Sequence, residues 1–242
     1  MIVTGAAGGI GRAVAQCFAA VGASVMAVDL DADAVEQVVA ELPGLRHFAL
    51  AADLTSMTSP HQIVEAATRQ FGTIRALAHT AAVLRRQATV DAVTEDDWDR
   101  QLDTNLKATF FLCREVANTM VRGGGPGSVI TFTSQGWWTG GFGGSVVYNT
   151  AKGGVVTLTR GLARSYGPTG VTFNSVAPGQ VRTRMLLEGL DSDVLLAMTE
   201  ATPLKRVAEP EEIAPVVVFL ASDHARFITG ATINASGGFL MY

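Results

Sequence analysis

The chain has 242 residues, of which 48% are hydrophobic and 17% are charged, and its net charge is -4 at pH 7. This composition is too apolar for a disordered chain and is typical of a sheet that is covered on both faces. The length fits a single domain over residues 1–242. The scattered Lys and Arg residues exclude a large basic surface, so we expect no nucleic-acid partner.

Cysteine content and apolar runs exclude further classes of protein. Cys17 and Cys113 can form neither a disulfide framework nor a metal-ligand spacing, and both are interpreted as buried thiols in a reducing compartment. The longest candidate apolar run, 216–221, is far shorter than the roughly 20 residues that span a bilayer. No basic segment followed by an apolar run stands at the N-terminus. We therefore expect a cytoplasmic protein with no metal site and no membrane partner.

Short apolar runs that predict strands alternate along the chain with amphipathic stretches that predict helices. The predicted strands are 2–3, 24–28, 45–51, 74–78, 128–133, 171–176 and 232–234. This alternation predicts an α/β fold with one doubly wound, mostly parallel sheet of the Rossmann type and helices on both faces.

Two long helices are predicted in the second half of the chain. The first spans about 95–121, with Thr94 as its N-cap, and the second spans about 147–166. The stretch 183–203 has weaker strand signals and is rich in Leu and Met. It is interpreted as a substrate lid, with a pair of surface helices as the alternative.

A glycine-rich turn follows the first predicted strand and opens a helix over about 12–21. Its sequence, TGAAGGIG at 4–11, has the context in which such turns bind a dinucleotide. Gly5 permits the tight turn, Gly9 lets a pyrophosphate approach the backbone, and Gly11 lets the helix pack on the strand. The helix N-terminus supplies amide donors to the anion. The alternative is a flexible glycine–alanine turn.

Two aspartates stand at the ends of the second and third predicted strands. Asp29 is placed to accept hydrogen bonds from the adenosine ribose hydroxyls, although a solvated aspartate at a strand end is the simpler alternative. A carboxylate there would repel a 2′-phosphate and no Arg immediately follows it, so NAD is favoured over NADP. Asp53 is interpreted either as a partner of the adenine amino group or as a cap of the strand end.

Tyr148 and Lys152 lie four residues apart at the start of the second long helix and therefore share a face. A phenol with an ordinary pKa of about 10 is a poor base at neutral pH. A nearby ammonium and an oxidised nicotinamide would both favour the phenolate. Such a pair also arises by chance, so the spacing alone is weak evidence of catalysis.

An ordered set of motifs resembles the short-chain dehydrogenase/reductase family over essentially the whole chain. The set consists of TGxxxGIG at 4–11, Asp29, Asp53, Asn105, Ser134, Tyr148-x-x-x-Lys152 and Pro178-Gly179. The resemblance implies an NAD(H)-dependent oxidoreductase that interconverts a small-molecule alcohol and a ketone or aldehyde. It also implies that Tyr148 is the general acid/base and that Lys152 lowers the pKa of Tyr148 and binds the nicotinamide ribose.

Further roles follow from the same resemblance. Ser134 would hydrogen-bond the substrate oxygen, and Asn105 would hold a water that links Lys152 to solvent; taken singly, they are a turn residue and an ordinary helix residue. The segment 178–183 resembles the part that wraps the nicotinamide. The implied cofactor-binding residues are Gly5, Gly9, Ile10, Gly11, Asp29, Leu30, Asp53, Leu54, Ala81, Tyr148, Lys152, Pro178, Gly179, Val181 and Thr183.

The sequence departs from the family pattern at four places: the short first strand, residues 79–82, the position of Ser134, and Ala235-Ser236 near the C-terminus. The second and third of these concern the site. HTAA stands at 79–82 where the family has Asn-Asn-Ala-Gly, and His79 is interpreted as a structural residue that hydrogen-bonds across strands rather than as a catalytic one. Ser134 lies one residue further from Tyr148 than the serine usually does in the family. The usual spacing would place Gln135, not Ser134, at the position of the substrate-binding hydroxyl. Because a hydroxyl is needed, Ser134 is preferred and Thr133 is the reserve.

Substrate and partners are less well defined by the sequence. Trp137, Trp138 and the Met-Leu-Leu run at 185–187 favour an apolar or ring-bearing alcohol or ketone. Alternatively, the tryptophans pack under the lid or in a subunit interface. The two long helices resemble those that form the family's dimer contacts, so we expect a homo-oligomer, either a dimer or a tetramer. A dinucleotide-binding sensor or scaffold without catalysis is the alternative function.

Overall fold

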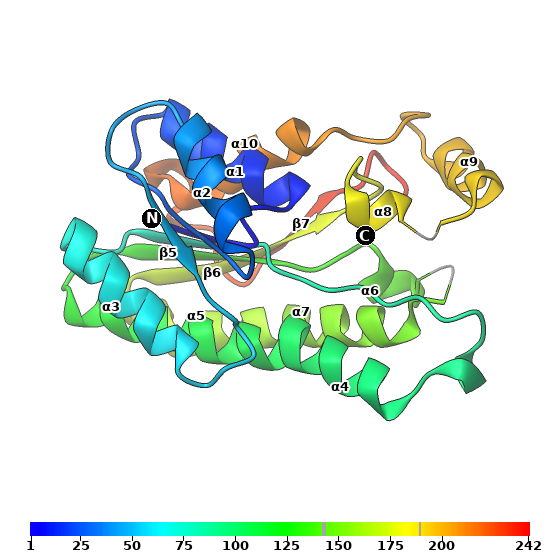
Figure 1. Cartoon of the computed structure of the whole chain (residues 1–242), viewed down its shortest axis with the longest axis horizontal. Coiled ribbons are helices and arrows are strands. Elements are labelled where there is room, and N and C mark those ends of the chain that lie inside the picture. Colours follow the sequence, from blue (N-terminus) through cyan, green and yellow to red (C-terminus); the bar gives the residue numbers. More distant parts are fainter. Residues whose placement is uncertain (142–143, 189) are drawn as a thin grey trace.

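A parallel sheet of seven strands is the centre of the computed structural model, which describes residues 1–141, 144–188 and 190–242 (Figure 1). The strands are β1 (Ile2–Thr4), β2 (Met26–Asp29), β3 (Phe48–Ala51), β4 (Ala76–His79), β5 (Gly127–Phe132), β6 (Val171–Pro178) and β7 (Thr232–Ala235). Their order in the sheet is β3-β2-β1-β4-β5-β6-β7, and all neighbours are parallel. The predicted doubly wound sheet is confirmed, and each of the seven predicted runs overlaps a strand.

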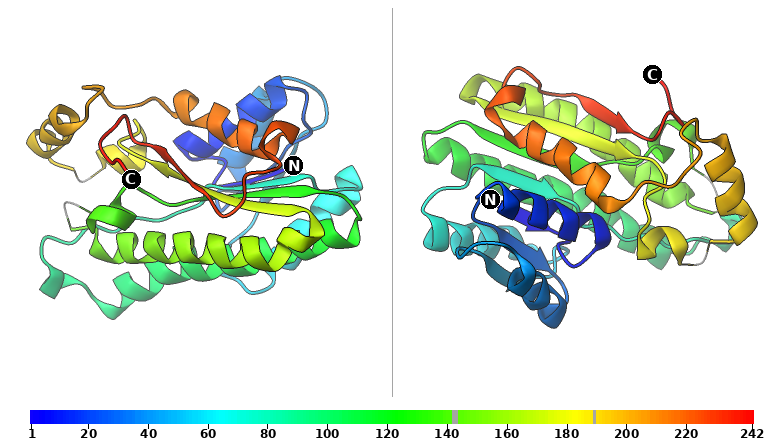
Figure 2. Two further views of the ribbon diagram at one scale, coloured as in Figure 1. Left: turned by 180° about the vertical axis from the view of Figure 1, so that it is seen from behind. Right: turned by 90° about the horizontal axis from the view of Figure 1, so that it is seen from above.

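Helices cover both faces of the sheet (Figures 1 and 2). One face carries α1 (Gly9–Ala20), α2 (Ala32–Glu41) and α10 (Pro210–Ala221), and the other carries α3 (Ser59–Phe71), α5 (Ala108–Arg122) and α7 (Val146–Tyr166). The shorter elements are η1 (Val90–Ala92), α6 (Gly136–Thr139), η3 (Gly167–Thr169) and η4 (Asp223–Ala225). No helix in the described part of the chain is long and apolar enough to cross a membrane.

Strands β1–β6 each contribute side chains to two hydrophobic cores, because successive residues of a strand point to opposite faces. In β4, Leu77 packs in the core under α3, α5 and α7, whereas Ala78 belongs to the core under α1, α2 and α10. Val129 and Ile130 divide in the same way in β5. This explains why the strands appear in the sequence as continuous apolar runs rather than as alternating ones.

The first long helix extends over 95–122, as the sequence predicts, but it is not a uniform α-helix. The structure has α4 (Glu95–Leu102), a π-helical segment (Asp103–Lys107) and then α5. Thr94 is the N-cap as predicted, and its side chain accepts a hydrogen bond from the amide of Asp97. A π turn adds a residue to one turn of a helix without a break in the chain and often occurs at a functional site.

The predicted lid segment contains two short helices beyond the carboxyl end of β6, α8 (Arg184–Leu187) and α9 (Ser192–Ala201) (Figure 1). Neither helix has a buried residue. Residue 189 of this segment lies outside the described residues. The segment therefore contains the pair of surface helices that the sequence gave as the alternative. Its position beyond the end of β6 also agrees with a substrate lid.

The two cysteines differ in burial. Cys113 is buried on α5, and burial raises the pKa of its thiol to about 12. Cys17 is half-buried, so the prediction that both thiols are buried was wrong for this residue. Cys17 lies at the margin of the apolar stripe by which α1 packs on the sheet.

Replacement of Phe173 tests the core under α3, α5 and α7. Phe173 lies in the middle of β6 and is fully buried, so Phe173→Ala should lower the free energy of unfolding by about 3–5 kcal/mol, because it leaves a cavity. Phe227 is fully exposed, so Phe227→Ala should change it by less than about 0.5 kcal/mol. Urea denaturation of both variants measures the difference, and equal losses would contradict the assigned core.

Candidate active site

The predicted site residues come from segments that follow neighbouring strands of the sheet. In parallel strands all carboxyl ends lie at one edge, and a ligand site forms there where the strand order reverses. The reversal lies between β1 and β4 in this sheet. The segments after β1, β2, β4, β5 and β6 therefore converge on this edge.

The glycine-rich turn after β1 has no room for a side chain at Gly5, Gly9 or Gly11. Gly5 has a φ of 65°, and a Cβ there would lie 2.6 Å from the Cα of Ala81. A Cβ at Gly11 would lie 2.0 Å from the carbonyl oxygen of Gly5, and one at Gly9 would lie 2.9 Å from Cγ2 of Thr183. The turn is thus held between the segments that follow β4 and β6, which argues against a merely flexible turn.

The start of α1 offers amide donors without a side-chain acceptor. Its N-cap is Gly8, which has no side chain to cap the helix, and the first turn contains Gly9, Ile10 and Gly11. The first amides of a helix need acceptors and carry partial positive charge. A pyrophosphate supplies such an acceptor, so this donor set fits a dinucleotide.

Asp29 is fixed against the glycine-rich turn. Its Oδ2 accepts a hydrogen bond from the amide of Ala7 at 2.9 Å, and its Oδ1 accepts one from the amide of Leu30 at 2.8 Å. A carboxylate has about four lone-pair sites, so acceptor capacity remains for two ribose hydroxyls. The side chain of Leu30 is exposed beside it.

Asp53 is bonded within its own turn after β3. Its Oδ1 accepts hydrogen bonds from the amide and hydroxyl of Thr55, at 2.9 and 2.7 Å. This is the capping arrangement that the sequence left open, and the contact with adenine stays a prediction. The next residue, Leu54, packs against the core under α3 and α5.

Lys152 joins α7 to the end of β5. Its Nζ donates a hydrogen bond to the carbonyl of Phe132 at 2.8 Å, and its own carbonyl accepts one from the hydroxyl of Thr133 at 2.7 Å. Lys152 is 3% exposed, and its Nζ lies 5.5 Å from the ring centre of Tyr148. These contacts bring Tyr148 and Lys152 to the end of β5, next to Ser134.

The choice between the two hydroxyl residues follows from these contacts. Thr133 is buried and its hydroxyl is engaged with the backbone of Lys152. Ser134 is half-buried, and its Oγ accepts a hydrogen bond from the amide of Gly136 at 3.2 Å, which leaves the hydroxyl proton for another acceptor. The geometry therefore favours Ser134 over the reserve residue.

The charges around Tyr148 differ from the sequence-based expectation. Burial raises the pKa of Tyr148 to about 12, and the charge that acts against this increase is that of Arg86. Burial lowers the pKa of Lys152 to about 7, so near neutral pH Lys152 is only partly protonated. Sequence reasoning missed Arg86 because it belongs to no motif; the available signal was a pair of arginines just after the fourth strand.

Asn105 binds the segment that follows β4. Its Oδ1 accepts a hydrogen bond from the amide of Val83 at 2.9 Å, and its Nδ2 donates one to the carbonyl of Val83 at 2.8 Å. Both ends of the side-chain amide are thus engaged, and Asn105 is fully buried in the π segment. The water that Asn105 is predicted to hold stays a prediction. The side chain itself holds Val83, and with it the segment after β4, against the π segment.

His79 has the structural environment that the sequence suggests. Its Nδ1 lies 2.7 Å from the hydroxyl of Thr4 on β1, and its Nε2 lies 2.9 Å from the hydroxyl of Thr109 on α5. Burial, and next to it the charge of Lys152, lowers the pKa of His79 to about 3. The predicted cross-strand hydrogen bond is confirmed, and the imidazole stays neutral.

The segment 178–183 runs from β6 to α8. The carbonyl of Pro178 accepts a hydrogen bond from the amide of Gln135, and a Cβ at Gly179 would lie 2.8 Å from the Cα of Ser236. Val181 is buried, and the hydroxyl of Thr183 caps the start of α8. The segment therefore connects the end of β5, the glycine-rich turn and α8.

The two tryptophans pack with the C-terminal residue. The rings of Trp137, Trp138 and Tyr242 have centres 5.1–6.0 Å apart. This packing does not decide whether the tryptophans contact a substrate, the lid or a second subunit.

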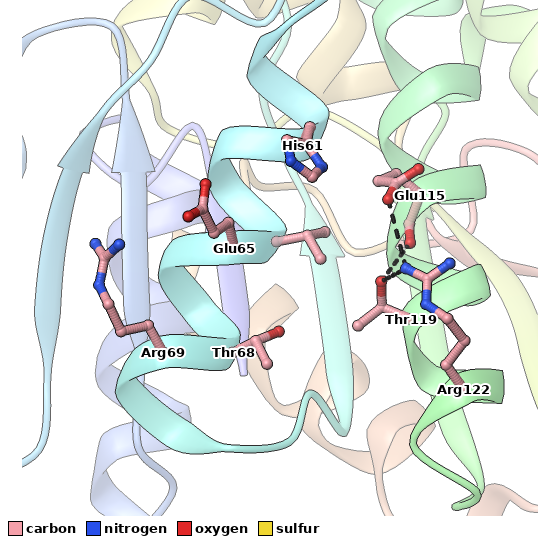
Figure 3. Close-up of a pocket in the computed structure, with 8 residues that line it drawn as sticks. His61, Glu65, Thr68, Arg69, Glu115, Thr119 and Arg122 are labelled. Carbon is pink, nitrogen blue, oxygen red and sulfur yellow. Dashed lines mark hydrogen bonds and ion pairs between the residues drawn. The ribbon is translucent and has the colours of Figure 1, made fainter.

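Figure 3 shows a pocket between α3 and α5 that contains none of the predicted site residues. It is lined by His61, Val64, Glu65, Thr68, Arg69, Glu115, Thr119 and Arg122.

Comparison with known proteins gives long matches. A family model described as Enoyl-(Acyl carrier protein) reductase matches residues 5–240. The chain is 35% identical to a (3R)-3-hydroxyacyl-CoA dehydrogenase of Mus musculus, over 99% of this chain and 95% of the relative. It is 37% identical to a D-threitol dehydrogenase of Mycolicibacterium smegmatis, over 98% of this chain and 91% of the relative.

Two solved structures from Brucella melitensis share the fold. A short-chain dehydrogenase/reductase titled glucose/ribitol dehydrogenase superposes with a TM-score of 0.91 at 35% identity, over 100% of this chain and 96% of the other. A 3-ketoacyl-(acyl-carrier-protein) reductase complexed with NADH superposes with a TM-score of 0.93 at 26% identity, over 99% and 97%. The relatives agree in fold and length and differ in their named substrates.

Replacement of His79 tests its neutral state. The unfolded chain protonates His79 below about pH 6.5, whereas the folded chain resists protonation down to about pH 3, so His79 makes stability fall as the pH falls through this window. Between pH 7.5 and pH 5, His79→Asn should lose less stability than the parent, by about 2 kcal/mol. Urea denaturation at both pH values measures this, and equal pH dependence of the two proteins would show the interpretation to be wrong.

Proposed function

Because the chain belongs to the short-chain dehydrogenase/reductase family, we propose that it is an NAD(H)-dependent oxidoreductase that interconverts an alcohol and a ketone or aldehyde. The observation that carries this proposal is the position of Tyr148 and buried Lys152 at the end of β5, beside Ser134. A phenol, an amine and a free hydroxyl at one strand end can bind a substrate oxygen and move its proton.

Bound NAD(H) supplies the acceptor or donor of the hydride. The side chains of the protein act on the substrate oxygen. Ser134 donates a hydrogen bond to this oxygen, and the Tyr148 hydroxyl gives or takes its proton. Because burial raises the pKa of Tyr148 to about 12, the hydroxyl keeps its proton at neutral pH and acts as an acid towards a carbonyl. In the oxidative direction the phenolate must be stabilised by nearby positive charge.

The cofactor preference rests on Asp29. Its carboxylate is held by two backbone amides beside the glycine-rich turn, at the place where the adenosine ribose would lie. A 2′-phosphate would meet this negative charge, whereas ribose hydroxyls would donate to it. The named NADH complex of a relative is compatible with this preference but belongs to that protein.

The segment 183–203 is proposed as the substrate lid. Its described helices α8 and α9 have no buried residue, so few contacts oppose their movement. Thr183 at its start packs against Gly9 of the glycine-rich turn, so the segment begins where the cofactor is proposed to bind. A lid here would cover the end of β5 and exclude water from Tyr148.

The oligomeric state is also a proposal. An apolar hollow on α4, the π segment, α5 and α7 is lined by Leu102, Asp103, Leu106, Lys107, Phe110, Phe111 and Leu158. Apolar side chains on these helices suit a contact with a second copy of the chain. A homodimer or homotetramer would cover them.

Replacement of Tyr148 tests the proposed proton transfer. A screen of secondary alcohols, polyols, steroids and hydroxy acids with NAD at alkaline pH, followed by the absorbance of the reduced cofactor, identifies a substrate. With that substrate, Tyr148→Phe should lower kcat by at least about 100-fold, the lower end of what general acid–base catalysis contributes.

The control is Tyr166→Phe, because the Tyr166 hydroxyl binds Asn118 on α5, away from the site. Its kcat should stay within about twofold of the parent value, a change below about 0.5 kcal/mol in the barrier. Unchanged turnover in Tyr148→Phe would overturn the proposed proton carrier. NAD binding without turnover of any alcohol would instead favour the sensor or scaffold.

Replacement of Asp29 tests the cofactor preference. The parent protein should bind NADH at least about tenfold more tightly than NADPH, a difference of about 1.4 kcal/mol. Asp29→Ser removes the negative charge and should narrow this ratio, mainly through tighter binding of NADPH. Fluorescence titration with each reduced cofactor measures both affinities, and an equal preference in the parent would contradict the interpretation of Asp29.

A further inference from the structure

Residues 83–87, which follow β4, form an extended strip. Its backbone amides donate hydrogen bonds at every second residue. The amide of Val83 donates to Asn105 Oδ1, that of Arg85 to Gln101 Oε1 at 3.0 Å, and that of Gln87 to the carbonyl of Gly144 at 3.1 Å. This strip therefore runs from the π segment to the residues just before α7, on which Tyr148 lies.

Side chains of the strip alternate between two faces, as in any extended chain. Arg85 and Gln87 both reach Asp97 on α4, at 3.1 and 2.7 Å. Arg86 lies between them and points the other way. The strip thus presents one arginine to α4 and the next to the candidate active site.

Arg86 binds the end of α8. Its Nη1 donates hydrogen bonds to the carbonyls of Glu188 at 2.7 Å and Met185 at 3.3 Å, and its Nη2 lies 3.4 Å from the carbonyl of Leu186. The last carbonyls of a helix lack partners within the helix and carry partial negative charge. Since α8 has no buried residue, the guanidinium is a main contact that holds it.

The same guanidinium acts on Tyr148. Positive charge at Arg86 works against the burial that raises the pKa of Tyr148. Burial lowers the pKa of Arg86, and Tyr148 acts against this decrease. Two other titratable groups of this region are less suited to this task. Burial lowers the pKa of Lys152 on α7 to about 7, and His79 is neutral. Arg85 is paired with Asp96 and Asp97 on α4, and the Arg184–Glu188 ion pair is exposed. Arg86 is therefore the group that stays fully charged in the alkaline range in which a phenolate forms.

We propose that Arg86 is a positioning residue of the proposed oxidoreductase, whose guanidinium both holds α8 closed and stabilises the phenolate of Tyr148. The inference rests on the proposed function for its use in catalysis. The two tasks share one side chain, so the positive charge is fixed beside Tyr148 when α8 is in place. Closure of the segment and activation of the phenol are thereby coupled.

Two variants separate the tasks. Arg86→Met removes both the charge and the donors, whereas Arg86→Lys keeps a charge but lacks the planar fork that reaches three carbonyls. The matched control is Arg184→Met on α8 itself, because the Arg184–Glu188 ion pair is 94% and 74% exposed and holds little.

The first measurement is amide hydrogen exchange in residues 184–188, followed by mass spectrometry. Exchange should become at least about fivefold faster in Arg86→Met and Arg86→Lys, because α8 opens more often, a shift of about 1 kcal/mol. It should change by less than about twofold in Arg184→Met, where the exposed ion pair contributes little.

The second measurement is the ionisation of Tyr148 in protein that carries 3-fluorotyrosine, whose phenol is more acidic than that of tyrosine. The ¹⁹F resonance of Tyr148 is the one that Tyr148→Phe removes. Its titration midpoint should rise by about one pH unit in Arg86→Met, because an opposite charge is lost, and by less than half as much in Arg86→Lys.

Neither measurement needs a substrate or a cofactor, so a chain without dehydrogenase activity would still give both results. Faster exchange with an unchanged midpoint in Arg86→Met would reduce Arg86 to a structural contact and overturn the proposal. A shifted midpoint with unchanged exchange would overturn it as well, because α8 would then not depend on Arg86.

Discussion

The buried amine of Lys152 fixes the geometry on which the candidate active site depends. It reaches the carbonyl of Phe132 while its own carbonyl receives the hydroxyl of Thr133, so α7 is joined to the end of β5 by two hydrogen bonds in opposite directions. Burial of an amine costs free energy unless its donors are used or its proton is lost. Here the amine donates a hydrogen bond to Phe132 and its pKa is lowered to about 7, so Lys152 is both a structural residue and a titratable one.

The two sides of the site differ in how firmly they are held. On one side, Asn105 and Gln101 bond the strip 83–87 from fully buried positions, and Gly144 closes its far end. On the other side, α8 and α9 bury no residue. A firmly bonded side and a weakly held cover are what a site needs if it must admit a substrate and then exclude water.

Much of the fold follows from local sequence signals. Buried parallel strands need continuous apolar runs, so all seven could be predicted, and Thr94 was recognisable as an N-cap because capping is local chemistry. The π segment could not be predicted, because one extra residue in a turn leaves the alternation of apolar and polar residues almost unchanged. Conversely, His79 was interpreted correctly because it stands where the family pattern has a structural Asn, and its hydrogen bond to Thr4 joins β4 to β1.

The candidate site was predicted less completely. The ordered motifs indicated Tyr148, Lys152 and Ser134, and the structure brings the segments that carry them together. Arg86 depends on contacts with residues about one hundred positions further along the chain, and no local pattern reveals such a pairing. Its effect on Tyr148 is visible only when β4, α7 and α8 are placed in space.

The close approach of Thr183 to Gly9 has a thermodynamic meaning. One residue belongs to the turn that is proposed to hold the pyrophosphate, and the other starts the proposed lid, so the two segments are packed against each other. A free-energy coupling between two sites is reciprocal. If order in the turn favours order in the lid, a substrate held under the lid must raise the affinity of the turn for the dinucleotide by the same factor by which the dinucleotide raises the affinity for the substrate.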